Sequence, residues 1–193
     1  MKALLLLVQL TVIVSRLTGQ AVEWQKGIVV LQNGSVINGS IHYPKGFGMI
    51  FIKNDEEKIV LTAEKVRLFR YYDSISNINR KFVSIKKNDH TTQFYEVVIN
   101  GEVSVVREMK KYADRSHPDE IDSYRYFAHY KNLMIPLTHF RNKVYPKLVE
   151  EQPIDIRTYV RGERLDPNEM QSALLIIKEF NRVKQGNLQA RAN

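Results

Sequence analysis

The histidines and the missing cysteine limit the chemistry that this chain can carry. The five histidines are His42, His90, His117, His129 and His139. None stands in the H-x-H or H-E-x-x-H spacing that is typical of metal sites. The absence of cysteine excludes disulfides, thiolate metal ligands and cysteine nucleophiles. Phosphate-binding loops and the G-x-S-x-G nucleophile motif are also absent, so the sequence predicts no catalytic residue, no metal site and no cofactor.

One stretch places aromatic and cationic side chains together. If residues 124–131 form a strand, the tyrosines share one face and the cations the other, because side chains alternate. The second face carries Arg125, Phe127, His129 and Lys131. Aromatic faces stack and arginine pairs with carboxylate or phosphate, so we predict these four as ligand-binding residues for an anionic glycan or a lipid headgroup. The alternative is a structural strand whose tyrosines pack beneath helices, since aromatic residues are favoured in strands.

The first residues are typical of an export signal. Met1-Lys2 supplies a positive start, Ala3 to Val14 is apolar, and Gly19-Gln20-Ala21 is a small-x-small cleavage site. The apolar run of 12 residues is shorter than the ~20 needed to span a bilayer. We therefore expect residues 1–21 to be a signal peptide, no transmembrane span in the mature chain, and a location in the periplasm, at the outer membrane or outside the cell.

The charge favours anionic partners. The chain has 29 Lys+Arg against 21 Asp+Glu, and cleavage would remove Lys2 and Arg16, which leaves a net charge of +6. A basic protein attracts acidic glycans, lipid surfaces or nucleic acid. Because the chain is expected to be exported, we predict no nucleic-acid partner, and we name an anionic glycan, a lipid headgroup or an envelope protein instead.

Two Asn-Gly dipeptides predict β-hairpins. Asn33-Gly34 lies between the β-branched runs 28–31 and 36–43, and Asn100-Gly101 lies between 94–99 and 102–107. A tight two-residue type I′ turn needs positive φ at both central positions, which Asn-Gly tolerates. Both faces of the second hairpin are largely apolar, so we expect it in the middle of a sheet that is covered on both sides.

The remaining strands and helices follow from periodicity. Residues 49–52, 58–61, 66–72, 81–85, 124–130 and 133–136 are further predicted strands, whereas 110–122 is charged and is predicted to be a mobile loop. From Thr138 the apolar period changes to about 3.6. Pro146 should split the first helix, and a second covers 154–160. Asp166, Pro167 and Glu169 predict the start of a third, and Gly186 its end.

These elements predict one α+β domain over residues 22–186. It consists of a mainly antiparallel, curved sheet of about eight to ten strands over 22–137, followed by three short helices over 138–186. Residues 187–193 are expected to be a disordered tail.

The opening motif W-x2-G-x3-L-x-N-G-x4-G-x-I-x-Y is filled by Trp24, Gly27, Leu31, Asn33, Gly34, Gly39, Ile41 and Tyr43. Together with the export signal, it resembles a group of exported, functionally uncharacterised Bacteroidota proteins. The resemblance implies an N-terminal β-sheet region and a short helical C-terminus. It implies no catalytic residues.

The sequence thus favours an exported, non-enzymatic binding or envelope-associated module of unknown ligand. One alternative is a periplasmic hydrolase whose site is assembled from distant residues, for example His129 with a carboxylate. Another is a structural subunit of an envelope complex, which an exposed sheet edge near Pro136 would suit.

Overall fold

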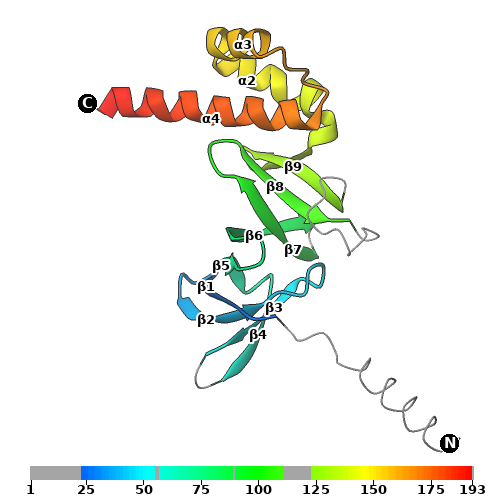
Figure 1. Cartoon of the computed structure of the whole chain (residues 1–193), viewed down its shortest axis with the longest axis vertical. Helices are drawn as coiled ribbons and strands as arrows, with labels where there is room; N and C mark the ends of the chain where they lie inside the picture. Colours follow the sequence, from blue (N-terminus) through cyan, green and yellow to red (C-terminus); the bar gives the residue numbers. More distant parts are fainter. Residues whose placement is uncertain (1–22, 55–56, 89, 111–122, 193) are drawn as a thin grey trace, which may run out of the picture.

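A computed structural model describes residues 23–54, 57–88, 90–110 and 123–192. The predicted signal peptide, nearly all of the predicted loop 110–122 and Asn193 lie outside the described residues. Figure 1 shows a sheet with a layer of helices at one end of the molecule. The fold is α+β: a ten-strand antiparallel sheet followed by three C-terminal helices, as the sequence predicted.

All ten predicted strands form. They are β1 (Gln25–Leu31), β2 (Val36–His42), β3 (Met49–Lys53), β4 (Lys58–Thr62), β5 (Val66–Asp73), β6 (Ile78–Asn88), β7 (Thr91–Ile99), β8 (Ser104–Met109), β9 (Tyr124–Tyr130) and β10 (Leu133–Pro136). Their order in the sheet is β10-β9-β8-β7-β6-β5-β1-β2-β3-β4. The order departs from a simple meander at one point: β5 does not pair with β4, which lies at the edge of the sheet, but with β1.

The helices follow two irregular turns, a 3₁₀ turn (Leu137–His139) and a π turn (Phe140–Val144). They are α2 (Tyr145–Glu151), α3 (Pro153–Gly162) and α4 (Met170–Ala192). Pro146 lies in the first turn of α2, where a missing N–H costs no helical hydrogen bond, so it divides the helical stretch as predicted.

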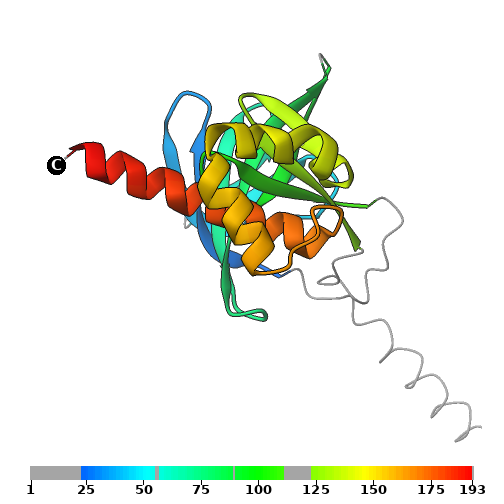
Figure 2. The same cartoon turned by 90° about the horizontal axis from the view of Figure 1, so that it is seen from above.

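Helix α4 differs from its prediction at both ends. It begins at Met170 because Asp166 caps a separate turn, in which its Oδ1 accepts from the Asn168 N–H. It then continues through Gly186 to Ala192, so the predicted end at Gly186 is wrong. The predicted disordered tail is helical up to Ala192. Gly186 has no positive φ and does not form a left-handed cap. Figure 2 shows this end of α4 extending past the rest of the molecule.

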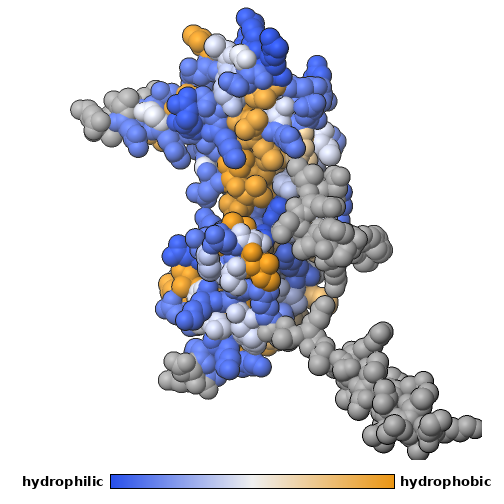
Figure 3. Space-filling view, viewed as in Figure 1, coloured by the Kyte–Doolittle hydropathy of each residue, from blue (hydrophilic) through white to orange (hydrophobic). Residues whose placement is uncertain are grey.

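One face of the sheet, the inner face, is buried along its whole width, but in two different ways. Around β1–β6 the sheet curls so that the inner face packs on itself, in a cluster centred on Val29, Ile50 and Phe69. Around β7–β10 the inner face packs against the helices, through Ala128, Phe140 and Phe180. Figure 3 shows hydrophobic residues gathered in a band down the middle of the molecule.

Both Asn-Gly hairpins form, but neither has the predicted tight turn. In the first, Gly34 has a φ of 88° whereas Asn33 is not in the positive region, and the pairing begins at Val30 opposite Val36. In the second, the ladder begins at Ile99 opposite Val105. The reason is a contact with α4: the Val103 N–H donates to Asn181 Oδ1, and Asn181 Nδ2 donates to the Val103 carbonyl, both at 2.9 Å. A helix thus replaces the cross-strand partner of Val103.

Candidate functional site

The structure places three of the four predicted ligand-binding residues on one face and the fourth elsewhere. Arg125, Phe127 and His129 lie on the outer face of β9, opposite the helices. Lys131 is the first residue of the β9–β10 turn, with a φ of 48°. Its Nζ lies 2.9 Å from Glu151 Oε1 on α2, so it faces the helical layer and does not join the other three.

The three residues on the outer face have separate surroundings. Arg125 is 52% exposed and its Nη2 lies 2.8 Å from Glu108 Oε1. Phe127 contacts Tyr95 edge to face, with ring centroids 5.8 Å apart. His129 lies between Ser104 of β8 and Met134 of β10, neither of which is a carboxylate. Of the three, Arg125 lines the pocket that is described below.

The tyrosines of β9 are buried, as the structural interpretation of this strand predicted. Tyr124, Tyr126 and Tyr130 are each at most 7% exposed and belong to the cluster beneath the helices. Two of them hold an arginine of the neighbouring strand: Arg107 Nη1 donates to the Tyr126 hydroxyl at 3.3 Å, and its Cζ lies 3.9 Å from the centre of the Tyr124 ring. Arg107 also belongs to a network of charged side chains that was not predicted from the sequence.

A buried ion network lies between the two apolar clusters of the inner face. Arg80 is only 3% exposed, and its Nε donates to Asp73 Oδ2 at 2.6 Å. Its Nη1 donates to Glu96 Oε1 at 2.7 Å, and the other oxygen of Glu96 accepts from Arg107 Nε at 2.8 Å. Glu96 thus bridges two arginines from β6 and β8. Buried charges require such pairing, because an unpaired ion in the interior costs several kcal/mol, on the order of 3–5 when one partner is removed.

The network shifts the pKa of Asp73 and of Arg107. Burial by itself would raise the pKa of Asp73, but the Arg80 guanidinium and the Ser76 backbone N–H hold it below the usual range. Burial works against the charge of Arg107, whereas its hydrogen bonds to Glu96 and Tyr126 raise its pKa. Asp73 and Arg107 are therefore both charged at neutral pH.

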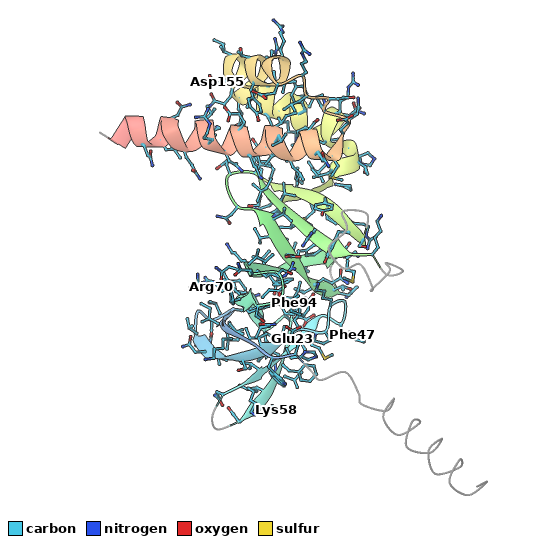
Figure 4. The ribbon with its side chains drawn as sticks, viewed as in Figure 1. Glu23, Phe47, Lys58, Arg70, Phe94 and Asp155 are labelled. Atoms are coloured by element: carbon cyan, nitrogen blue, oxygen red, sulfur yellow. The ribbon has the colours of Figure 1, made fainter. Side chains whose placement is uncertain are left out.

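A pocket of about 390 Å³ opens beside this network. Its lining includes Met109 and five aromatic side chains, which come from the β2–β3 connection, β6, β7 and β9: Tyr43, Phe47, Phe82, Phe94 and Tyr124. Burial raises the pKa of Tyr43, helped by the nearby charges of Glu96 and Glu108, so its hydroxyl is protonated at neutral pH. Figure 4 marks Phe94, which comes from β7, and Phe47, which comes from the β2–β3 connection.

The charged lining of the pocket is predominantly positive. Its cations are Lys45, Lys87, Arg107, Lys110 and Arg125, against two carboxylates, Glu96 and Glu108. Both carboxylates already contact arginines of the lining. Lys45 Nζ lies 3.5 Å from the Tyr124 hydroxyl, which places one cation against the aromatic wall. The pocket therefore combines ring faces with an excess of positive charge, and this combination suits an anionic ligand that carries a ring or a short apolar part.

The β2–β3 connection forms one wall of the pocket because its glycines let the chain turn sharply. Gly46 has a φ of 92° and Gly48 a φ of 64°, a region that other residues rarely adopt. The turn is closed by the Phe47 N–H, which donates to the Pro44 carbonyl, and the Gly48 carbonyl accepts from Ala63. Phe47 is left 64% exposed at the pocket.

The pairing of Glu96 with Arg107 depends on the register of the β7–β8 hairpin, and the tight turn predicted from the sequence gives a different register. A tight turn at Asn100-Gly101 would set Glu96 opposite Val105, whereas the observed register sets it opposite Arg107. The Asn181 contact that lengthens the turn therefore also creates the Glu96–Arg107 pair. No sequence motif marks Tyr43 and Lys45 as pocket residues, because they reach the pocket only when the sheet curves and brings the β2–β3 connection over it.

A second hollow, of about 460 Å³, lies between the β7–β8 turn and α4. It is lined by Glu102, Gln152, Asn181, Lys184 and Leu188, among others, and its charges balance. No group of His, Asp and Glu within the described ranges could hold a metal ion. In the same part of the chain no helix is both long and apolar enough to cross a membrane.

Comparisons of the chain with protein-family models, with curated proteins and with solved structures find no match. The interpretation of the site therefore depends on its own geometry and chemistry.

Proposed function

We propose that this protein is an exported, non-enzymatic binding or envelope-associated module, and that the pocket beside Arg107 is its ligand site. The observation that carries the proposal is the lining: five aromatic rings and five cations, with both carboxylates already in contact with arginine. Arg125, one of the residues predicted from the sequence, lies on this lining.

The ligand is a small anion attached to a ring or a short apolar chain. A volume of about 390 Å³ is at the small end of ligand pockets, so it suits one sugar unit or one headgroup and not a long chain. A carboxylate or phosphate would meet Lys45 and Arg107, and the remainder would contact Tyr43 and Phe94. Two sources share this chemistry: an acidic sugar, which carries a carboxylate, and a lipid headgroup, which carries a phosphate.

Calorimetric titration of the mature protein with glucuronate and with glycerol phosphate tests the proposal and separates the two sources. Binding of either should weaken with salt, because the screening length falls to about 3 Å at 1 M. Lys45→Ala and Arg125→Ala should each weaken binding, by roughly fivefold for a charge pair worth about 1 kcal/mol.

The matched control is Lys178→Ala, which removes one exposed cation from α4, away from the pocket. It should leave the affinity unchanged. Absence of binding of either anion, or equal weakening by Lys178→Ala, would reject the pocket as the ligand site.

A further inference from the structure

The outer face of β1–β6 carries a row of cations that the proposed pocket does not use. In the sheet register, Lys26 lies opposite Ser40, Ser40 opposite Lys53, and Lys53 opposite Lys58, so the row crosses β1, β2, β3 and β4. All three lysines are exposed. On the same face, Arg70 of β5 lies directly opposite Lys81 of β6. The outer face therefore presents five cations across six neighbouring strands.

Nothing on this face of the described strands neutralises the cations. The one acidic residue in β1–β6 is Asp73, which lies on the inner face with Arg80. Among the described residues, none of the five cations forms an ion pair. Two of the cross-strand pairs, Arg70–Lys81 and Lys53–Lys58, are like charges directly opposite one another, an arrangement that destabilises a sheet. A polyanion laid over them would relieve this repulsion.

A row of aromatic rings runs beside the lysine row. Trp24 and His42 have ring centroids 5.9 Å apart, and His42 and Phe51 are also 5.9 Å apart. Val60, which is 50% exposed, continues this row on β4. The two rows are two residues apart along each strand, or about 7 Å. Lys58 joins them, with its Nζ 5.3 Å from the centre of the Trp24 ring.

We propose that this face, defined by Lys26, Lys53, Lys58, Trp24, His42 and Phe51, binds an acidic polysaccharide that crosses the strands. The carboxylates of successive sugars would lie on the lysine row, and the apolar faces of the sugar rings would lie on the aromatic row. Ser40 supplies a neutral hydroxyl between two lysines for sugar hydroxyls.

The curvature of the sheet favours a flexible chain over a bilayer. The inner face of β1–β6 packs on itself around Phe69 and Ile50, so the outer face is convex. Six strands span about 24 Å along this curve, at about 4.8 Å per strand. A flat membrane would touch few of these strands at once, whereas a polysaccharide can follow the curve and reach Lys58 and Lys81 together.

Affinity electrophoresis and calorimetry with polygalacturonate test the inference on the full mature chain, with dextran as the neutral counterpart. Polygalacturonate should bind and dextran should not, and the affinity should fall steeply with salt. Lys53→Gln and Lys26→Gln should each weaken binding about fivefold, as expected for loss of about 1 kcal/mol. Phe51→Ala should weaken binding without changing its salt dependence.

Two control variants separate this face from the rest of the molecule. Lys147→Gln removes an exposed cation from α2 and leaves the face intact, so polysaccharide binding should not change. Lys45→Ala, in the pocket, should also leave it unchanged, so this inference and the proposed function can fail separately.

Three results would overturn the inference. Equal weakening by Lys147→Gln and Lys53→Gln would show a general charge effect. Equal binding of dextran would remove the role of the lysine row. Binding of single-stranded DNA, or of vesicles with 30% anionic lipid, as tight as that of polygalacturonate and equally sensitive to Lys53→Gln, would replace the polysaccharide by another polyanion.

Discussion

Removing Arg80 should destabilise the protein more than removing almost any exposed residue. Arg80 is 3% exposed and donates to Asp73, to Glu96 and, at 3.2 Å, to Ser76 Oγ. In Arg80→Met, the apolar part of the side chain is kept, but Asp73 and one oxygen of Glu96 lose their charged donor. Because breaking a buried ion pair leaves an uncompensated charge, the free energy of unfolding should fall by about 3–5 kcal/mol.

Urea denaturation, followed by circular dichroism, measures this loss. A protein of this kind has a stability of roughly 5–15 kcal/mol, so a folded Arg80→Met variant should remain measurable. The matched control is Arg182→Met. Arg182 is 73% exposed and pairs with Glu179 three residues earlier on α4, so its loss should lower the free energy of unfolding far less than the loss of Arg80.

A double-mutant cycle assigns the effect to the network. Arg80→Met combined with Glu96→Gln should cost less than the sum of the single changes, because the second substitution removes a charge that the first left unpaired. A cost below about 1 kcal/mol for Arg80→Met, or strict additivity with Glu96→Gln, would refute the view that this network stabilises the junction of the two clusters.

Three further predictions concern the helices and the export signal. Ile177→Ala should lower the free energy of unfolding by about 2–5 kcal/mol, because Ile177 is fully buried on the core-facing side of α4, whereas Leu175→Ala, at a 42% exposed position, should change it little. Burial would raise the pKa of Glu151, but hydrogen bonds from Lys184, Tyr130 and Lys131 lower it from 4.5 to about 2. The contribution of this carboxylate to the free energy of unfolding is therefore complete above pH 4.5 and is lost as the pH falls through about 2. In Glu151→Gln, the free energy of unfolding should depend less on pH within that window. Urea titrations at pH 6 and pH 3 would measure the difference. Mass spectrometry of the exported protein should find a chain that begins at Val22, and a chain that retains Met1 to Ala21 would contradict the predicted cleavage.

The strands were predictable because their signals are local. Alternation and the two Asn-Gly dipeptides located all ten strands, and the change of period at Thr138 located the helical region. The buried face of α4 is centred on Ile176 and Ile177, with Leu174 at its margin. Turn geometry was not predictable, because the Asn181–Val103 contact joins residues 78 positions apart.

Candidate sites were harder to predict for the same reason. Alternation along 124–131 correctly separated Tyr126 from Phe127, yet it could not show that Lys131 directs its Nζ toward Glu151 on α2. The residues of the pocket come together only when the β2–β3 connection folds over β6–β9. No spacing along the sequence encodes that approach.

The same physical cause underlies the pocket and the ion network. A sheet whose inner face packs partly on itself and partly on helices must have a junction between the two clusters, and at that junction neither covering layer is complete. Glu96 and Arg107 occupy the junction on neighbouring strands, and both also line the pocket. Arg80 fixes Glu96 from the other side, so a ligand that contacts Arg107 would meet a donor already held in place. Binding would then lose little side-chain entropy, which is an advantage for a small anion that makes few contacts.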